Sequence, residues 1–164
     1  MDTILIKTAF CCMACDGDIS EDEIKMLESS SLLSDFSKDD FLREVSSFKN
    51  DGKKYLKDYV ALLADKSMNM LSEKKTSILR LAVDMIKADG VVKYSEIKFF
   101  KLIMSVLNVS PKFVLENIED IDDDWVDSDF SQSKDELSKS FFGNFQLNAM
   151  DTANINQLEL IKEE

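Results

Sequence analysis

The apolar residues of this chain recur with the spacing of α-helices along most of its length. The spacing predicts a helix from Asp2 to about Cys15. A second helix is expected to begin at Ser20, because Glu23 follows three residues later in the pattern of a capping box. Six more helices are expected, over about 37–51, 53–66, 72 to the Asp89-Gly90 turn, 94–108, 110–118 and 133–142. The chain is therefore predicted to be all-α, a single-domain bundle of about seven to eight helices.

The arrangement of apolar residues also predicts which helices are buried. In the first segment, Leu5, Thr8, Ala9, Cys12 and Met13 share one face, which we expect to point inward. The segment 94–108 is apolar nearly all round, which predicts that it is the central and most buried helix. Only four glycines and one proline interrupt the chain, in keeping with helices joined by short connections.

One unusual pattern occurs twice, at an offset of 73 residues from Asp16 to Asp89. Each copy contains an Asp-Gly pair followed by an isoleucine or valine and then by a glutamate. The apolar residues before the turn correspond at the same offset. An internal repeat predicts two pseudo-symmetric helix–turn–helix units. The two copies are Asp16-Gly17-Asp18-Ile19 with Glu23, and Asp89-Gly90-Val91-Val92 with Glu96.

Both copies match the second half of a calcium-binding EF-hand loop, in which Asp, Gly, Ile and Glu occupy positions 5, 6, 8 and 12. The first half does not match. Positions 1 and 3 would be Cys12 and Ala14 in one copy, and Met85 and Lys87 in the other, and none of these offers a carboxylate. An ordinary EF-hand is therefore excluded. A calcium-responsive binding protein with degenerate EF-hand-like loops remains an alternative.

The repeated pattern resembles the TerB-like family of tellurite-resistance proteins, which also includes the N-terminal domain of a DnaJ-type co-chaperone. The resemblance covers about residues 2–118 and departs at Cys15, where the family usually has a small residue such as alanine. It implies one all-helical fold with two pseudo-symmetric halves. It also implies a divalent-metal site formed by the paired acidic residues, which here are Asp16, Glu23, Asp89 and Glu96. Because the chain has no histidine, Mg²⁺ or Ca²⁺ is expected rather than zinc.

The same four residues also have a purely structural interpretation. Asp16 would close its loop by accepting backbone hydrogen bonds while Gly17 takes a positive φ. Glu23 would pair with Ser20 in the capping box. Glu96 is harder to explain in this way, because Lys93 stands at the N-cap position and its side chain cannot cap.

The formal net charge of −12 argues against direct contact with nucleic acid or with an anionic membrane. A cationic protein partner or a divalent cation suits this charge better, although an acidic surface also serves solubility alone. No apolar run reaches the ~20 residues that span a bilayer, and the acidic N-terminus is unlike a signal peptide. A cytoplasmic protein without membrane insertion is expected.

Cys11, Cys12 and Cys15 are predicted to be buried core thiols rather than a disulfide framework or a zinc site.

The composition changes after residue 119, which divides the chain into a helical domain (1–119) and a C-terminal segment (120–164). This segment contains an acidic linker, a short helix and a polar tail. Asp120 to Asp124 begins like a calcium loop, but Trp125 occupies the glycine position, so a solvated linker is expected. The aromatic residues of the segment are predicted to be partner-binding anchors, namely Trp125, Phe130, Phe141 and Phe142.

Together these features predict a non-enzymatic, TerB-like stress-response or defence module that binds a partner protein. The sequence contains no recognisable nucleophile–base pair and no glycine-rich phosphate loop, so an enzyme is not expected. A metal-dependent hydrolase that uses the four carboxylates is the enzymatic alternative.

Overall fold

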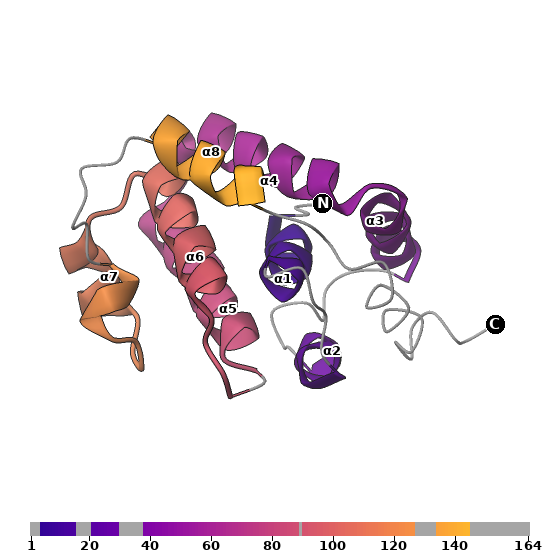
Figure 1. The fold of residues 1–164 in the computed structure, drawn as a ribbon, viewed down its shortest axis with the longest axis horizontal. Coiled ribbons are helices and arrows are strands. Elements are labelled where there is room, and N and C mark those ends of the chain that lie inside the picture. The colour runs from indigo at the N-terminus through magenta and orange to yellow at the C-terminus, as the bar shows by residue number, and fades with distance from the viewer. Residues whose placement is uncertain (1–3, 16–20, 30–37, 89, 127–133, 145–164) are drawn as a thin grey trace.

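A computed structural model describes residues 4–15, 21–29, 38–88, 90–126 and 134–144 (Figure 1). In these ranges every regular element is helical and no strand occurs, as the sequence predicts. The α-helices are α1 (Ile4–Ala14), α2 (Glu21–Ser29), α3 (Lys38–Asn50), α4 (Gly52–Lys66), α5 (Ser72–Ile86), α6 (Tyr94–Leu107), α7 (Pro111–Asn117) and α8 (Lys134–Asn144). Two short 3₁₀ turns, η2 (Ser67–Asn69) and η3 (Asp123–Trp125), lie between them.

Local side-chain chemistry explains several of the helix boundaries. The Asp51 carboxylate accepts a hydrogen bond from the Lys54 backbone N–H at 3.1 Å and so caps the start of α4. The Ser110 hydroxyl does the same for the Phe113 N–H at 3.0 Å, and Pro111 follows at the first helical position. At its other end, α6 stops where Asn108 adopts the left-handed conformation, with φ 57° and ψ 42°.

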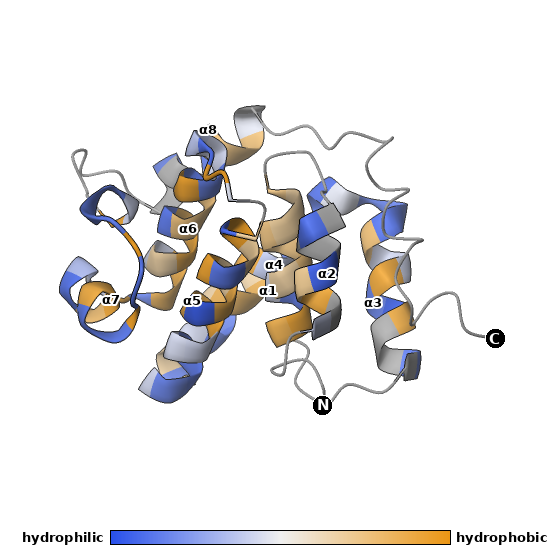
Figure 2. Cartoon of the chain, turned by 90° about the horizontal axis from the view of Figure 1, so that it is seen from below, coloured by the Kyte–Doolittle hydropathy of each residue, from blue (hydrophilic) through white to orange (hydrophobic). Residues whose placement is uncertain are grey.

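The most enclosed helix is α1, in which nine of 11 residues are buried. It packs against α5, α4, α3 and α2, and Figure 1 shows it lying between them. The prediction that the segment 94–108 is the central and most buried helix is wrong. Eight of the 14 residues of α6 are buried, but α1, to which the sequence pattern gave only one inward face, is enclosed more completely because four helices pack around it. Figure 2 shows the same arrangement by hydropathy, with the apolar residues of α1, α4 and α5 gathered in the interior.

Polar side chains on α1 are paired inside the bundle. The Thr8 hydroxyl donates to the Ile4 carbonyl at 2.8 Å and shares a 2.7 Å hydrogen bond with the Tyr59 hydroxyl. The Lys7 ammonium lies 2.7 Å from Glu44 of α3, which also accepts a 2.7 Å hydrogen bond from the Tyr55 hydroxyl of α4. Glu44 therefore joins three helices through a single, mostly buried carboxylate.

The three cysteines are buried and form no disulfide with one another, which confirms the prediction of core thiols. Burial, reinforced by the neighbouring Cys12, raises the pKa of the Cys11 thiol well above its usual value. Because the thiolate is the reactive form, a raised pKa makes this cysteine less reactive at neutral pH.

In the part of the chain that the structure describes, no helix has both the length and the apolar character needed to cross a membrane.

We predict that Glu44→Ala destabilises the fold by about 2 kcal/mol, because it leaves the Lys7 ammonium and the Tyr55 hydroxyl without their shared acceptor. Urea denaturation followed by circular dichroism measures the change. Asp58→Ala is the matched control, since it breaks the exposed Lys54–Asp58 pair and is expected to leave the midpoint unchanged. Equal effects of the two substitutions would contradict a stabilising role for the buried carboxylate.

Candidate functional site

The second Asp-Gly turn joins α5 to α6. The Lys87 N–H bonds the Val83 carbonyl at 2.9 Å as the helix ends, and the Gly90 N–H bonds the Lys87 carbonyl at 3.0 Å. Gly90 has a φ of +80°, the conformation that the sequence analysis assigned to the equivalent Gly17. Such a φ strains residues that carry a Cβ, so this position requires glycine. Lys93 is then extended, with φ −97° and ψ 156°, and α6 begins at Tyr94.

Glu96 lies in the first turn of α6 and is only 1% exposed. Its carboxylate accepts a hydrogen bond from the Lys93 backbone N–H at 2.8 Å. From the sequence, Glu96 is harder to explain as a structural residue, because the Lys93 side chain cannot cap. The structure supplies that explanation, because this half of a capping box requires only the backbone N–H of the N-cap residue. A negative charge here also interacts favourably with the helix dipole.

The other predicted metal ligands are not described by the structure. Asp16 and Asp89 lie outside the described residues, and for Glu23 only the backbone is described, in the first turn of α2. Among the residues that are described, no cluster of three or more potential ligands is placed to hold a metal ion. A shared cation site at Asp16, Glu23, Asp89 and Glu96 thus stays a prediction.

The predicted partner-binding aromatics pack on the chain's own helices. Trp125 is 4% exposed and meets Phe100 of α6 edge to face, with the ring centroids 5.2 Å apart. Phe141 of α8 lies 5.0 Å from the ring of Phe99. Phe142 is also buried, and the Lys57 ammonium of α4 lies 5.6 Å from the centre of its ring. Phe130 lies outside the described residues.

These contacts change the interpretation of the C-terminal segment. Figure 1 shows α8 lying along α4 and α6, and α6 and α8 are in contact. The described part of 120–164 is therefore an extension of the helical bundle, built onto α6 by Trp125 and Phe141. This placement weakens the prediction that Trp125, Phe141 and Phe142 anchor a partner, because their rings are already covered.

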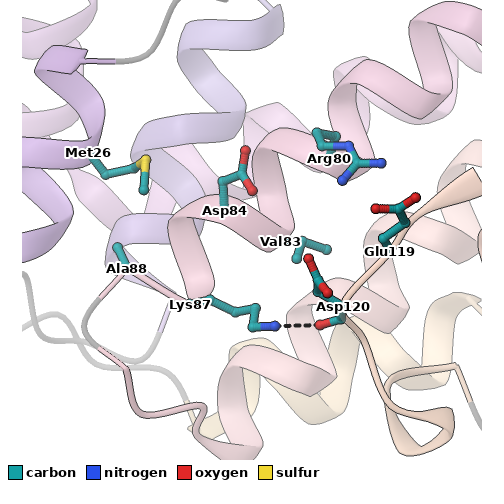
Figure 3. Close-up of a pocket in the computed structure, with 8 residues that line it drawn as sticks. All are labelled: Met26, Arg80, Val83, Asp84, Lys87, Ala88, Glu119 and Asp120. Carbon is teal, nitrogen blue, oxygen red and sulfur yellow. Dashed lines mark hydrogen bonds between the residues drawn. The ribbon is translucent and has the colours of Figure 1, made fainter.

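A pocket of about 290 Å³ lies beside the α5–α6 turn (Figure 3). The last turns of α5 form one wall, and the loop after α7 forms the other. Met26 of α2 and Ala88 add apolar surface. The charged residues of the lining are Arg80, Asp84, Lys87, Glu119 and Asp120.

The two cations of this pocket hold the end of α7 and the loop after it against α5. A guanidinium nitrogen of Arg80 donates to the Asn117 carbonyl at 3.2 Å, and the Lys87 ammonium donates to the Asp120 carbonyl (Figure 3). Partial burial raises the pKa of Asp84, while Arg80 and Lys87 act in the opposite direction. The pocket thus combines carboxylates with cations that already have acceptors in the chain itself.

The sequence analysis missed an exposed apolar group in the same region. Val91 is 58% exposed and Val92 is 36% exposed in the connection between α5 and α6, and Tyr94, the first residue of α6, is 72% exposed. The available signal was the position of the two valines. Apolar residues in a turn, outside the helical period, have no helix face that would bury them.

We predict that Glu96→Ala destabilises the protein by about 1 kcal/mol through loss of the cap. Glu96→Gln should retain much of this stability, because its amide oxygen still accepts a hydrogen bond from the Lys93 N–H. Thermal melts in the presence of a chelator measure both variants. If Gln is as damaging as Ala, the charge of Glu96 rather than its cap hydrogen bond is what matters.

In comparisons with known proteins, no family model matches the chain, and no curated protein or solved structure matches it either.

Proposed function

We propose that this protein is a non-enzymatic, TerB-like module of the cytoplasm that binds a partner protein in a stress or defence response. In this proposal its repeated Asp-Gly turns also bind a divalent cation. The observation that carries the proposal is the recurrence of the Asp-Gly…Glu pattern at two helix junctions.

The helix boundaries support the two-repeat interpretation. At the 73-residue offset, the first residue of α2, Glu21, corresponds to Tyr94, the first residue of α6. The end of α1 at Ala14 corresponds to Lys87, one residue after the end of α5. The two helix pairs also pack on one another, through α1 with α5 and through α2 with α5. Equivalent turns would therefore belong to equivalent helix pairs in a single bundle.

The cation would require Asp16, Glu23 and Asp89 in addition to Glu96. Hard cations such as Mg²⁺ and Ca²⁺ take several oxygen ligands, and carboxylates gathered from two turns would supply them. Glu96 already serves α6 as a cap, so it contributes least to the case for a metal.

We predict that millimolar Mg²⁺, Ca²⁺ or Mn²⁺ raises the melting temperature of the wild-type protein. A ligand that binds only the folded state stabilises it by an amount set by its concentration relative to its dissociation constant. Asp89→Asn should abolish the shift, whereas Asp65→Asn, an exposed position on α4, should leave it intact. Isothermal titration calorimetry with the same ions gives the affinity. The absence of any shift would leave the carboxylates with a turn-forming role alone.

The partner-binding part of the proposal depends on exposed charge rather than on the buried aromatics. Asp122, Asp123 and Asp124 are exposed, immediately before the buried Trp125. Charged groups at such a surface steer an oppositely charged partner and determine which partners are rejected. A basic protein surface is therefore the partner that this segment favours.

We predict that the immobilised full-length protein retains a basic partner from a lysate of its native cell, and that neutralising these aspartates reduces the recovery. The variant carries Asp122→Asn, Asp123→Asn and Asp124→Asn, and quantitative mass spectrometry compares the retained proteins. The full chain is used because a truncation at Glu119 would remove Trp125 and Phe141 from the core. Equal recovery by both proteins would locate the interaction elsewhere.

A further inference from the structure

A second pocket, of about 430 Å³, opens between α4 and α8. Helix α8 packs on α6, and α6 packs on α4, so the three helices border a groove whose base is α6. Figure 1 shows α8 beside both of them. We call this hollow the α4–α8 groove. Its volume falls in the range of roughly 300–1,000 Å³ that is typical of sites for small ligands.

The base and the α4 wall of the α4–α8 groove are apolar. Val106 of α6, Val60 of α4 and Phe142 of α8 are buried and close its base. Ala61 and Ala64 form the α4 wall, and their side chains end at Cβ. A longer side chain at either position would occupy the hollow. An apolar group that lies in the groove is removed from water, which favours its binding.

The charge in the groove is of one sign. Lys57 and Lys139 line it, and among the described residues no carboxylate does. Asp65 of α4 and Glu136 of α8 are exposed on the same helices but do not contribute to the lining. The pocket beside the α5–α6 turn differs, because it contains carboxylates as well as cations. In a chain of net charge −12, a hollow with two lysines and no acid favours an anionic occupant.

Both lysines retain donors for a ligand. The Lys57 ammonium carries three N–H donors, and its cation–π contact with Phe142, at 5.6 Å from the ring centre, holds it beside the groove without a carboxylate. Asp58, the next residue, is engaged with the lysine one turn before it, at 2.8 Å. Among the described residues, no hydrogen bond, ion pair or ring contact engages Lys139 or the Ser138 hydroxyl, which also lines the groove.

We propose that the α4–α8 groove binds a free aliphatic carboxylic acid, the class of the fatty acids. The hydrocarbon chain lies on Val60, Val106 and Phe142, and the carboxylate accepts hydrogen bonds from Lys57 and Lys139. Charge-assisted hydrogen bonds of this kind are stronger than neutral ones. Ligand sites in general combine a mostly apolar surface with a few polar groups that fix the orientation of the ligand.

A free acid suits this groove better than an anionic lipid in a bilayer. The net charge of −12 repels an anionic membrane surface. Segments that bind such surfaces carry clusters of roughly 4–8 basic residues, whereas the described lining of the groove contains Lys57 and Lys139 alone as cations. Two cations and a closed apolar base match one carboxylate on one chain.

The groove goes beyond the proposed function and is independent of it. It involves neither the Asp-Gly turns nor the aspartates before Trp125. A failure to bind the acid therefore leaves the cation-dependent melting shift and the capture of a basic partner untouched, and their failure leaves the groove untouched.

The test is a titration of the isotope-labelled full-length protein with sodium octanoate in the millimolar range, followed by two-dimensional NMR. We expect saturable shifts of the groove residues Ala61, Ala64 and Phe142. Octan-1-ol has the same chain without the charge and should bind about fivefold or more weakly, because it offers the lysines no carboxylate. No saturable shift, or shifts confined to other residues, would overturn the proposal.

Filling the groove tests the position of the chain. Ala61→Leu should weaken octanoate binding about tenfold or more, because the added atoms occupy the hollow. Ala61 is exposed, so the variant is expected to fold, which circular dichroism verifies. Ser29→Leu is the control: it adds a leucine at the exposed end of α2 and should bind octanoate like the wild type. Equal binding by the two variants would show that octanoate lies elsewhere.

Removing the two cations tests the position of the carboxylate. Lys57→Gln with Lys139→Gln should reduce octanoate binding to the level of octan-1-ol and leave octan-1-ol binding unchanged. The matched control, Lys25→Gln with Lys112→Gln, removes the same charge from exposed positions on α2 and α7 and should bind both probes normally. Equal weakening by the control would reduce the role of the lysines to general charge and contradict the proposed site.

Two other occupants have their own signatures. Sedimentation equilibrium without octanoate would detect a dimer, and a dimer that Ala61→Leu abolishes would assign the groove to a second copy of the chain. Flotation with phosphatidylcholine vesicles, with and without phosphatidylglycerol, would detect membrane binding. Retention on the anionic vesicles that Lys57→Gln with Lys139→Gln abolishes would assign the groove to a lipid surface. Either result would overturn the assignment to a free acid.

Discussion

The enclosure of α1 is the constraint on which the rest of the structure depends. Apart from Lys7 and Thr8 its segment from Ile4 to Ala14 is apolar, and nine of its 11 residues are buried. A helix of this kind is stable in water only when other elements cover it completely. Helices α2, α3, α4 and α5 provide that cover, which makes their positions consequences of one buried helix.

Covering α1 on all sides also places polar groups in the interior, where each needs a partner. The Thr8 hydroxyl is satisfied by Tyr59 and by the Ile4 carbonyl, and the Lys7 ammonium reaches Glu44. Buried polar networks that are fully paired specify one packing arrangement, because any shift leaves a donor or acceptor without its partner. Glu44 and the two tyrosines therefore fix how α3 and α4 sit against α1.

In the second half of the bundle, the connections between helices are held by other interactions than the buried polar pairs around α1. Gly90 reverses the chain and Glu96 caps α6. Arg80 holds the end of α7 to α5, and Lys87 holds the loop after α7. Trp125 and Phe141 then cover the outward face of α6. With these aromatics buried, the exposed groups of this half of the bundle include Val91, Val92 and Tyr94 before and at the start of α6, and Asp122, Asp123 and Asp124 before Trp125.

The sequence alone determined the helices, because the features that define them act locally. These features are the apolar periodicity, the helix start at Ser110-Pro111 and the break between two helices at Asp51. It also determined the burial of the cysteines. Tertiary structure decided which helix is central, since α1 becomes fully enclosed only when four others pack around it. It decided that Glu96 is a cap and that Trp125 and Phe141 are core residues. In a sequence, an acidic residue suits both a helix cap and a metal site, and an aromatic residue suits both a core and a partner-binding surface. Only the neighbours that folding brings close determine which role the residue has.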